Sequence, residues 1–258
     1  MYKVGVIGGS GFETLISEGV RKRDLDRYGS IDYTLGYVKG IETVFIPRHG
    51  FKHEYPPHKI PFKAMINLLN KLDIDRVIGI SAVGSLREDL PPGSIAIPIQ
   101  LIDYTIRRDT FYEDHPIHVD VSRPYCRALI KILLDKAEEL GIKVEYGLTY
   151  VATEGPRFET PSEIRMFKVL GGDLVGMTNI PEAILAREAG MHYALITLVT
   201  NYAAGMQDLV DMDEVYRISK MRERDIFRLV EESIPVISSS ELDDECIRFR
   251  GRFREVSR

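Results

Sequence analysis

Residues that could bind an oxyanion recur where three apolar segments of the chain end. Ser10 lies in the turn GGSG after the first segment, and Arg48 and His49 follow the second. Ser81 and Ala82 close the third. Small-residue turns let backbone N–H groups and hydroxyls approach an anion, and a guanidinium beside an imidazole adds charged donors. Each group alone also suits an ordinary turn, but together they predict a phosphate-like anion site.

A second candidate region runs from Leu174 to Ala204 and reads LVGMTNIPEAILAREAGMHYALITLVTNYAA. It predicts a short strand, a helix that begins at Pro181 and ends at Gly190, and a long buried strand. Open α/β sheets bind ligands beyond the carboxyl ends of their strands, so the polar exits Met177-Thr178 and Thr200-Asn201 are candidate site positions. Ordinary caps and turns are the alternative for both exits.

Charged residues of this predicted helix are expected on its solvent side. Glu182 and Glu188 follow the proline in the first turn and precede the glycine in the last. Carboxylates are seldom fully buried unless they are paired. The sequence therefore predicts that both face water.

Apolar periodicity predicts the other elements that must position these residues. Strands are expected at Tyr2–Ile7, Tyr33–Val38, Ile41–Ile46, Val77–Ser81, Ile95–Ile102 and Val144–Thr153, and helices at Pro61–Leu72, Cys126–Leu140, from about Pro161, and at Asp211–Glu232. The predicted fold is α/β, a single domain with a mixed central β-sheet flanked by helices.

Composition limits the function classes. With 44% hydrophobic and 28% charged residues, and no apolar run near the roughly 18 residues of a membrane span, the chain reads as a globular protein without a membrane partner. A net charge of −5 argues against general nucleic-acid binding. Only Cys126 and Cys246 are present, and no signal peptide is recognised, so a reducing, cytoplasmic location is expected.

Three weaker motifs have simpler explanations. GGSG lacks the third glycine of a dinucleotide fingerprint, which argues against an NAD-dependent oxidoreductase. The pair His115 and His118 has Pro116 between its members and no clear carboxylate partner, so no metal site is predicted. The segment 239–258 carries five acidic residues and five arginines, and is expected to be a docking or disordered tail rather than an RNA-binding segment.

GMTNIPE, the following AREAG helix end and an apolar strand closing in TN resemble the trimeric purine nucleoside phosphorylase and methylthioadenosine phosphorylase family. The resemblance extends from Lys3 to about Ile234. It implies a nucleoside phosphorylase domain over residues 1–238, followed by a charged tail at 239–258. It also implies a homotrimer, or a homohexamer built as a dimer of trimers, with active sites at subunit interfaces.

The resemblance further implies a role for each matching residue. Phosphate binding falls to Ser10, Arg48, His49, Ser81, Ala82 and Thr178; nucleoside binding to Phe158, Glu159, Met177, Asn201, Tyr202, Ala203 and Met212, and to His118 of a neighbouring subunit; and catalysis to Asn201, Glu159 and His49. Inorganic phosphate is the implied co-substrate, and no metal or other cofactor is expected.

The chemistry of two residues suggests which base is bound. An ionised Glu159 can only accept, which suits the N1–H of a 6-oxopurine, and the amide of Asn201 can donate to O6 or N7. Methylthioadenosine members of the family have a small hydroxyl residue and an aspartate at these positions, although the motifs EGPRF and SLRE resemble that branch. The predicted substrate is S-methyl-5'-thioinosine, with inosine and guanosine also candidates. A methylthioadenosine phosphorylase, a hydrolytic nucleosidase and a non-catalytic purine sensor are the alternatives.

Overall fold

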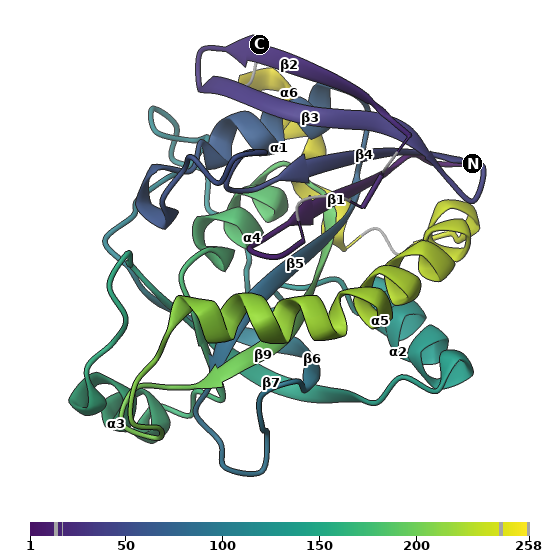
Figure 1. Ribbon diagram of the computed structural model, residues 1–258. Coiled ribbons are helices and arrows are strands. Elements are labelled where there is room, and N and C mark those ends of the chain that lie inside the picture. The colour runs from purple at the N-terminus through teal and green to yellow at the C-terminus, as the bar shows by residue number, and fades with distance from the viewer. Residues whose placement is uncertain (13–14, 17, 243–244, 257–258) are drawn as a thin grey trace.

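The polypeptide begins with four consecutive strands and then mixes strands and helices as far as its C-terminal segment (Figure 1). The computed structural model describes residues 1–12, 15–16, 18–242 and 245–256. The strands are β1 (Val4–Gly8), β2 (Val20–Asp26), β3 (Gly29–Val38), β4 (Ile41–Pro47), β5 (Arg76–Ser85), β6 (Ile95–Tyr104), β7 (Val144–Thr153), β8 (Leu174–Gly176) and β9 (His192–Tyr202). The helices are α1 (Phe62–Lys71), α2 (Arg127–Leu140), α3 (Pro161–Val169), α4 (Asn179–Glu188), α5 (Met212–Ser239) and α6 (Arg250–Val256), with 3-10 turns η1 (Pro57–Lys59) and η2 (Cys246–Phe249).

Local sequence explains where several helices start and stop. The Thr160 hydroxyl accepts from the backbone N–H of Glu163, whose carboxylate accepts in return from the N–H of Thr160, and this capping box starts α3. Helix α2 ends at Gly141, which adopts φ +68°, a conformation that costs glycine little. Asp211 caps the first turn of α5 by accepting from the N–H of Asp213.

The strands form one mixed sheet in the order β2-β3-β4-β1-β5-β8-β7-β6-β9. Strands β4, β1, β5 and β9 are mutually parallel, whereas β8 runs antiparallel to β5 and β6 runs antiparallel to β9. Because β9 also pairs with β5, the strands β5, β8, β7, β6 and β9 close into a ring. The predicted mixed α/β sheet is confirmed.

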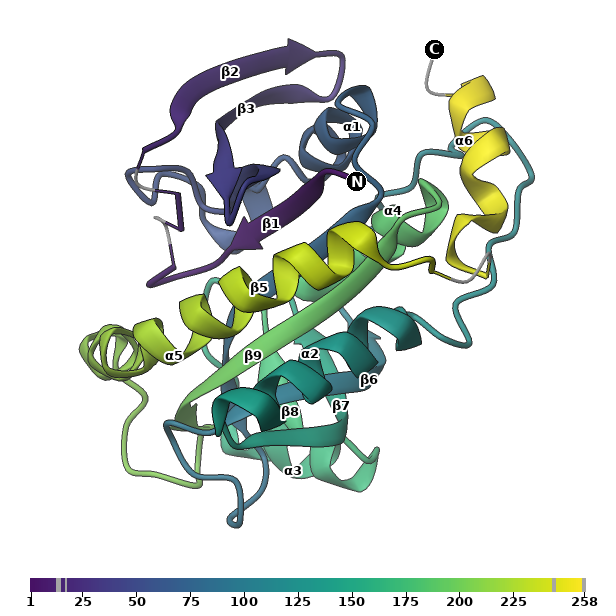
Figure 2. The same cartoon turned by 90° about the vertical axis from the view of Figure 1, so that its right-hand side faces the viewer.

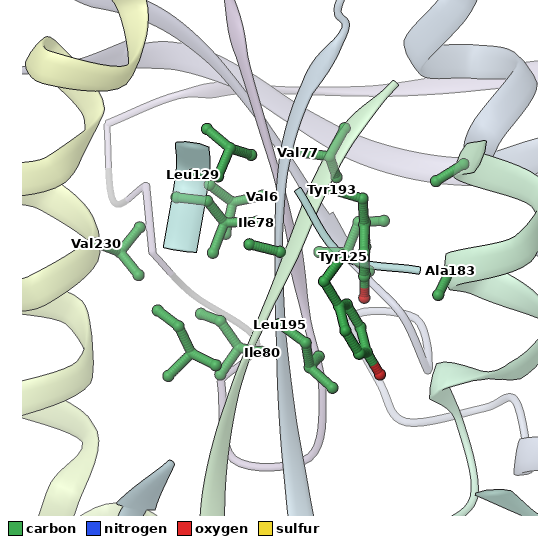
Figure 3. Packing of buried hydrophobic residues seen from close by; sticks show 14 of the residues in the cluster. Val6, Val77, Ile78, Ile80, Tyr125, Leu129, Ala183, Tyr193, Leu195 and Val230 are labelled. Atoms are coloured by element: carbon green, nitrogen blue, oxygen red, sulfur yellow. The ribbon is translucent and has the colours of Figure 1, made fainter. Parts of the chain in front are cut away.

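Helices cover both sides of the central strands. Helices α2 and α5 pack on each other and against β9 on one side, and α1 and α4 lie together on the other (Figure 2). Figure 3 shows Val230 of α5 and Leu129 of α2 on one side of β5 and β9, and Ala183 of α4 on the opposite side. All three side chains are buried, so β5 and β9 are covered on both faces, which explains their nearly continuous apolar sequences.

Several element boundaries differ from the predictions. Strand β2 was not predicted, because its sequence VRKRDLD has no apolar alternation. Strand β5 continues to Ser85 instead of ending at Ser81, since it stays paired with β9 as far as Tyr202. Helix α4 contains non-helical backbone at Ile180, and α5 continues beyond the predicted end through Pro235.

The C-terminal segment docks on the protein through its described residues. The Phe253 side chain is fully buried and packs edge-to-face on Phe111 at 4.7 Å between ring centroids. Arg250 Nη1 donates to the Asp75 carboxylate at 2.6 Å, and Arg123 Nη1 lies 2.8 Å from a carboxylate oxygen of Glu245. Among the described helices, none has the length and apolarity that a bilayer crossing demands.

Candidate active site

A cavity opens where the parallel strands β1, β4, β5 and β9 lead toward the first turn of α5. Figure 2 shows the carboxyl ends of β1 and β9 pointing toward this end of α5. The lining comes from seven segments: Gly9 and Ser10; His49, His53 and Pro57; Ser81 to Gly84; Pro156, Phe158 and Glu159; Val175 to Thr178; Thr200 and Asn201; Met212 and Val215. Both candidate regions of the sequence therefore meet in one cavity.

Hydroxyl groups gather on one side of this cavity. Ser81 Oγ lies 3.2 Å from Thr178 Oγ1, and both residues are buried next to the small side chain of Ala82. Ser10 lines the same cavity from the turn after β1. Three hydroxyls can each donate to an oxyanion, so this side has the donors that a phosphate requires.

The sheet topology explains why Ser81 reaches the cavity. The prediction that Ser81 and Ala82 stand at a strand end is wrong, because both lie inside β5. Strand β8 is short and pairs with β5 only at Gly84 and Ser85. The chain leaving β8 therefore passes Ser81, which brings Thr178 against it.

His49 is held by a backbone contact that assigns its hydrogen. Its Nδ1 lies 2.8 Å from the carbonyl oxygen of Tyr55. A carbonyl only accepts, so Nδ1 carries the hydrogen and Nε2 is the acceptor of the neutral ring. His49 can donate to phosphate through Nε2 only as an imidazolium, in which state it also adds a positive charge.

Arg48 does not line the cavity, which corrects the expectation that its fork faces phosphate. The side chain is fully buried, and Nε and Nη2 donate to the two carboxylate oxygens of Glu182 at 2.6 and 2.8 Å. Nη1 donates to the carbonyl of Ile80 at 2.8 Å. Burial alone would lower the pKa of Arg48, but the charge and hydrogen bonds of Glu182 raise it, so the guanidinium stays charged behind the hydroxyl cluster.

Glu182 belongs to a buried hydrogen-bond chain, and the expectation that it faces water is wrong. Its Oε1 accepts from the Tyr193 hydroxyl at 2.6 Å, and that hydroxyl accepts from Asn179 Nδ2 at 2.9 Å. The Tyr125 hydroxyl donates to Asn179 Oδ1 at 2.5 Å. This chain holds the start of α4, next to Thr178, against β9.

Glu188 is buried as well, contrary to the sequence expectation. Its carboxylate accepts from Thr110 Oγ1 and from the backbone N–H of Phe111, both at 2.7 Å. The end of α4 is thereby attached to the segment that follows β6. A buried carboxylate needs such donors, and spacing along one helix could not show them.

Phe158 and Glu159 line the same cavity from the loop after β7. Thr153 Oγ1 donates to Glu159 Oε1 at 2.6 Å. Burial raises the pKa of Glu159, and the Thr153 hydrogen bond opposes this shift without cancelling it. Glu159 is therefore a positioned acceptor whose protonation begins at higher pH than that of a free carboxyl.

Asn201 at the end of β9 has a fixed amide orientation. Its Nδ2 donates to the carbonyl of Tyr202 at 2.9 Å, and its Oδ1 accepts from Thr200 Oγ1 at 2.9 Å. A flipped amide would place two acceptors against each other at Tyr202. One amide hydrogen and one lone pair remain in this orientation, so Asn201 can donate once to a ligand.

Met177, Met212 and Val215 add apolar surface to the lining of this cavity. His53 lies at the same cavity, stacked on His49 with 4.5 Å between ring centroids. The lining thus combines hydroxyl and imidazole groups, a carboxylate and an amide with thioether and aliphatic groups. The cavity therefore suits an amphipathic ligand that includes an anionic group.

Besides Arg48, three predicted site residues lie outside the cavity. Tyr202 directs its hydroxyl to the carbonyl of Glu88 at 3.0 Å, and Ala203 is buried in a small apolar cluster. His118 is exposed and lines a separate hollow with Arg248 and Arg252. The geometry thus brings together Ser10, His49, Ser81, Ala82, Phe158, Glu159, Met177, Thr178, Asn201 and Met212.

Sequence reasoning missed two residues that hold the site. Glu182 pairs with Arg48 across 134 positions, and a proline-flanked acid carries no local sign of such a partner. Arg107 donates from Nη1 to the carbonyls of Met177 and Ile180 at 2.7 and 2.9 Å. An arginine followed by another in an irregular loop reads as a solvated charge, so no signal marked it.

Comparisons with known proteins agree with this arrangement. A sequence model described as the phosphorylase superfamily matches residues 3–235. The chain is 43% identical to the probable S-methyl-5'-thioinosine phosphorylase of Methanopyrus kandleri, over 96% of this chain and 93% of that protein. It is also 43% identical to the 6-oxopurine nucleoside phosphorylase of Pyrococcus furiosus, over 92% and 94% of the two chains.

A solved structure is similar over the whole fold. The methylthioadenosine phosphorylase of Schistosoma mansoni in complex with adenine superimposes with a TM-score of 0.91 at 28% identity, covering 100% of this chain and 99% of that one. Two relatives named for different nucleosides are equally identical to this chain, and a third, named for methylthioadenosine, has the same fold. Overall similarity therefore does not show which purine base this chain binds.

Proposed function

This chain belongs to the phosphorylase superfamily, in its purine nucleoside and methylthioadenosine phosphorylase family, and on that premise we propose that it phosphorolyses 6-oxopurine nucleosides. The preferred substrate is S-methyl-5'-thioinosine, and the products are hypoxanthine and 5-methylthioribose 1-phosphate. Inosine and guanosine are weaker substrates. We also propose that this reaction serves purine salvage in the cytoplasm.

The observation that carries the choice of base is the pairing of Glu159 with Asn201 across one cavity. Glu159 is held by Thr153 as an acceptor, which matches the N1–H of a 6-oxopurine. Asn201 has one amide hydrogen left for O6 or N7. Adenine offers an acceptor at N1, so it would face Glu159 with two acceptors opposed and a buried polar group unpaired.

The proposed reaction uses phosphate as nucleophile and needs little covalent chemistry from the protein. A phosphate oxygen attacks C1' while the bond from C1' to N9 breaks, and the electron pair of that bond passes into the purine. Ser10, Ser81, Thr178 and an imidazolium at His49 would hold the anion below the sugar. The Asn201 N–H would stabilise the charge that develops on the departing base. Catalysis then consists of positioning and electrostatic stabilisation.

Arg48 enters this proposal as a positioning residue. Its charge is paired with Glu182 and lies behind Ser81 and Thr178. It supports the backbone at Ile80, which precedes Ser81 in β5. No metal is part of the proposed reaction.

The 5' end of the nucleoside is proposed to lie against Met212 and Val215, whose apolar side chains favour a methylthio group over a hydroxyl. His118 lies outside its own chain's cavity. A contact between His118 and substrate would therefore be made in a neighbouring subunit, which supports a homotrimer or homohexamer as the working assembly.

A panel of nucleosides tests the proposal. Methylthioinosine, inosine, guanosine, adenosine and methylthioadenosine are assayed with and without phosphate, and released base is quantified. We expect phosphate-dependent release, fastest with methylthioinosine. Release at the same rate without phosphate would indicate a nucleosidase, and faster release from methylthioadenosine would refute the assignment of the base. Binding without turnover would indicate a purine sensor.

A further inference from the structure

Three side chains with soft metal-ligating atoms meet far from the proposed active site. Cys126 immediately precedes α2, His192 begins β9 and Cys246 begins η2 in the C-terminal segment. All three are buried, and their ligand atoms lie within 4.8 Å of one another. Asn201 lies nine positions after His192 along β9, a distance of about 30 Å at roughly 3.3 Å per residue. The cluster is therefore not part of the nucleoside cavity.

The distance between two of the ligand atoms is already close to that found within a metal site. Cys126 Sγ is 3.3 Å from His192 Nδ1. A metal with bonds of about 2.3 Å to sulfur and 2.0 Å to nitrogen holds its ligand atoms at similar spacings. The three residues come from separate parts of the chain, so the folded protein brings them together.

Charge compensation for thiolates is also in place. Arg76 pairs in register with His192, and its side chain is almost fully buried. Its Nε makes no hydrogen bond with any residue the structure describes and lies 3.7 Å from Asp75 Oδ1. The register pair sets Arg76 beside His192, whose Nδ1 contacts Cys126 Sγ. A thiolate at Cys126 would therefore have a buried cation near it.

We propose that Cys126, Cys246 and His192 form a site for a monovalent thiophilic ion, copper(I). Binding forms two copper–sulfur bonds and one bond to the neutral imidazole Nδ1, and the two thiols release their protons to solvent. The ion and two thiolates together carry one negative charge, which Arg76 compensates.

The number of ligands distinguishes copper(I) from zinc. Among the residues with described positions, no further histidine, cysteine or carboxylate joins the group. Structural zinc is almost always bound by four ligands in a tetrahedron, whereas two thiolates and an imidazole suit a soft ion of lower coordination number.

The expected effect of the ion is on the C-terminal segment. Cys246 precedes the turn that carries Phe249 into the protein, and α6 follows with Arg250 on Asp75 and Phe253 on Phe111. A bond from Cys246 to copper would connect this segment to α2 and β9. Loading should therefore raise the unfolding temperature without changing the kinetics of phosphorolysis.

Titration of the full-length protein tests the site. Reduced, metal-free protein is titrated anaerobically with copper(I) against the chromogenic chelator bicinchoninate, and with zinc in a parallel series. We expect one copper(I) per chain, thiolate-to-copper absorption in the near ultraviolet, and an X-ray absorption spectrum with two sulfur neighbours and one nitrogen. Zinc should bind more weakly.

Variants give the matched controls. Cys246→Ser and Cys126→Ser should each weaken copper(I) binding more than about a hundredfold, since loss even of outer-shell partners costs 10- to 100-fold. His115→Gln changes an exposed histidine and should leave binding unchanged. If a cysteine variant fails to fold, the X-ray absorption spectrum of the copper-loaded wild type tests the proposal instead, because it counts the sulfur and nitrogen neighbours of the ion. The proposal would be overturned if the wild-type protein retained no copper against the chelator, or if either cysteine variant retained copper as well as the wild type does. Isolation of a Cys126–Cys246 disulfide in place of the copper complex would also overturn it.

Discussion

Replacement of Asn201 by aspartate should shift the proposed enzyme from 6-oxopurines toward 6-aminopurines. Asn201 now donates to the Tyr202 carbonyl at 2.9 Å and accepts from Thr200 at 2.9 Å. An ionised aspartate would set a second acceptor against the carbonyl and remove the donor that faces the base. An unpaired polar group costs about 1–3 kcal/mol, so loss of the base contact alone should lower kcat/KM for methylthioinosine about 5- to 150-fold.

Protonation of the new aspartate should restore part of the network. A neutral carboxyl can donate to the Tyr202 carbonyl, and this contact together with burial should raise its pKa. Its other oxygen then accepts from the 6-amino group of adenine. Activity of Asn201→Asp on methylthioadenosine should therefore grow as the pH falls, and adding Glu159→Ser should enlarge the gain by removing the acceptor opposite N1.

The assay is the ratio of kcat/KM for methylthioinosine to that for methylthioadenosine in wild type, both single variants and the double variant. The two changes should be non-additive, because both residues contact one base. Asn70→Asp makes the same chemical exchange on α1 away from the cavity, and should leave the ratio unchanged. A wild-type ratio near one, or a ratio that Asn201→Asp does not move, would show that the base is selected elsewhere.

Four other outcomes are expected. Burial raises the pKa of Glu159 above its ordinary 4.5, so kcat/KM for methylthioinosine should fall on acidification with a midpoint above that value. If the pH profile of Glu159→Gln kept this midpoint, Glu159 would not be the group that titrates. Glu182→Ala leaves a buried guanidinium unpaired and should lower the free energy of unfolding, measured in urea, by about 3–5 kcal/mol. The double variant Arg48→Met with Glu182→Leu should recover most of this stability. An unchanged free energy of unfolding in Glu182→Ala would count against the buried pair. Ser81→Ala should raise KM for phosphate more than KM for the nucleoside in initial-rate assays, and an equal rise in both would assign Ser81 a structural role. Met212→Ala should reduce the ratio of kcat/KM for methylthioinosine to that for inosine. In the wild type, burial of one methylthio group can make this ratio at most about 10 to 200. A ratio that Met212→Ala leaves unchanged would show that the 5' pocket lies elsewhere.

The chemical residues of the site were largely predictable, because many of them lie near or just after the end of a strand whose apolar sequence is easy to recognise. His49, Thr178 and Asn201 stand just after β4, just after β8 and near the end of β9, and the sheet brings these positions to one cavity. The sequence therefore predicted the site as separate groups of polar residues at strand ends. Their proposed roles come from the family, since spacing alone left ordinary turns as an alternative.

The supporting contacts could not be predicted, because their partners are distant in sequence. Arg48 looked like a phosphate ligand until the structure placed Glu182 on its fork. The position of Ser81 depends on where β8 stops pairing with β5, and strand length is set by partners rather than by local pattern. Likewise, no local signal in VRKRDLD shows that β2 belongs to the sheet.

That charged strand has a consequence for the behaviour of the protein at high concentration. The pairing of β9 with β5 leaves β2 as the terminal strand of the described sheet. Exposed backbone donors and acceptors on a terminal strand can recruit strands of other molecules, and charged side chains oppose that. Arg21, Lys22 and Arg23 are exposed there, so a strand added to this edge would have to accommodate their charges. The chain thus carries its own protection against edge-to-edge aggregation at the terminal strand of its described sheet.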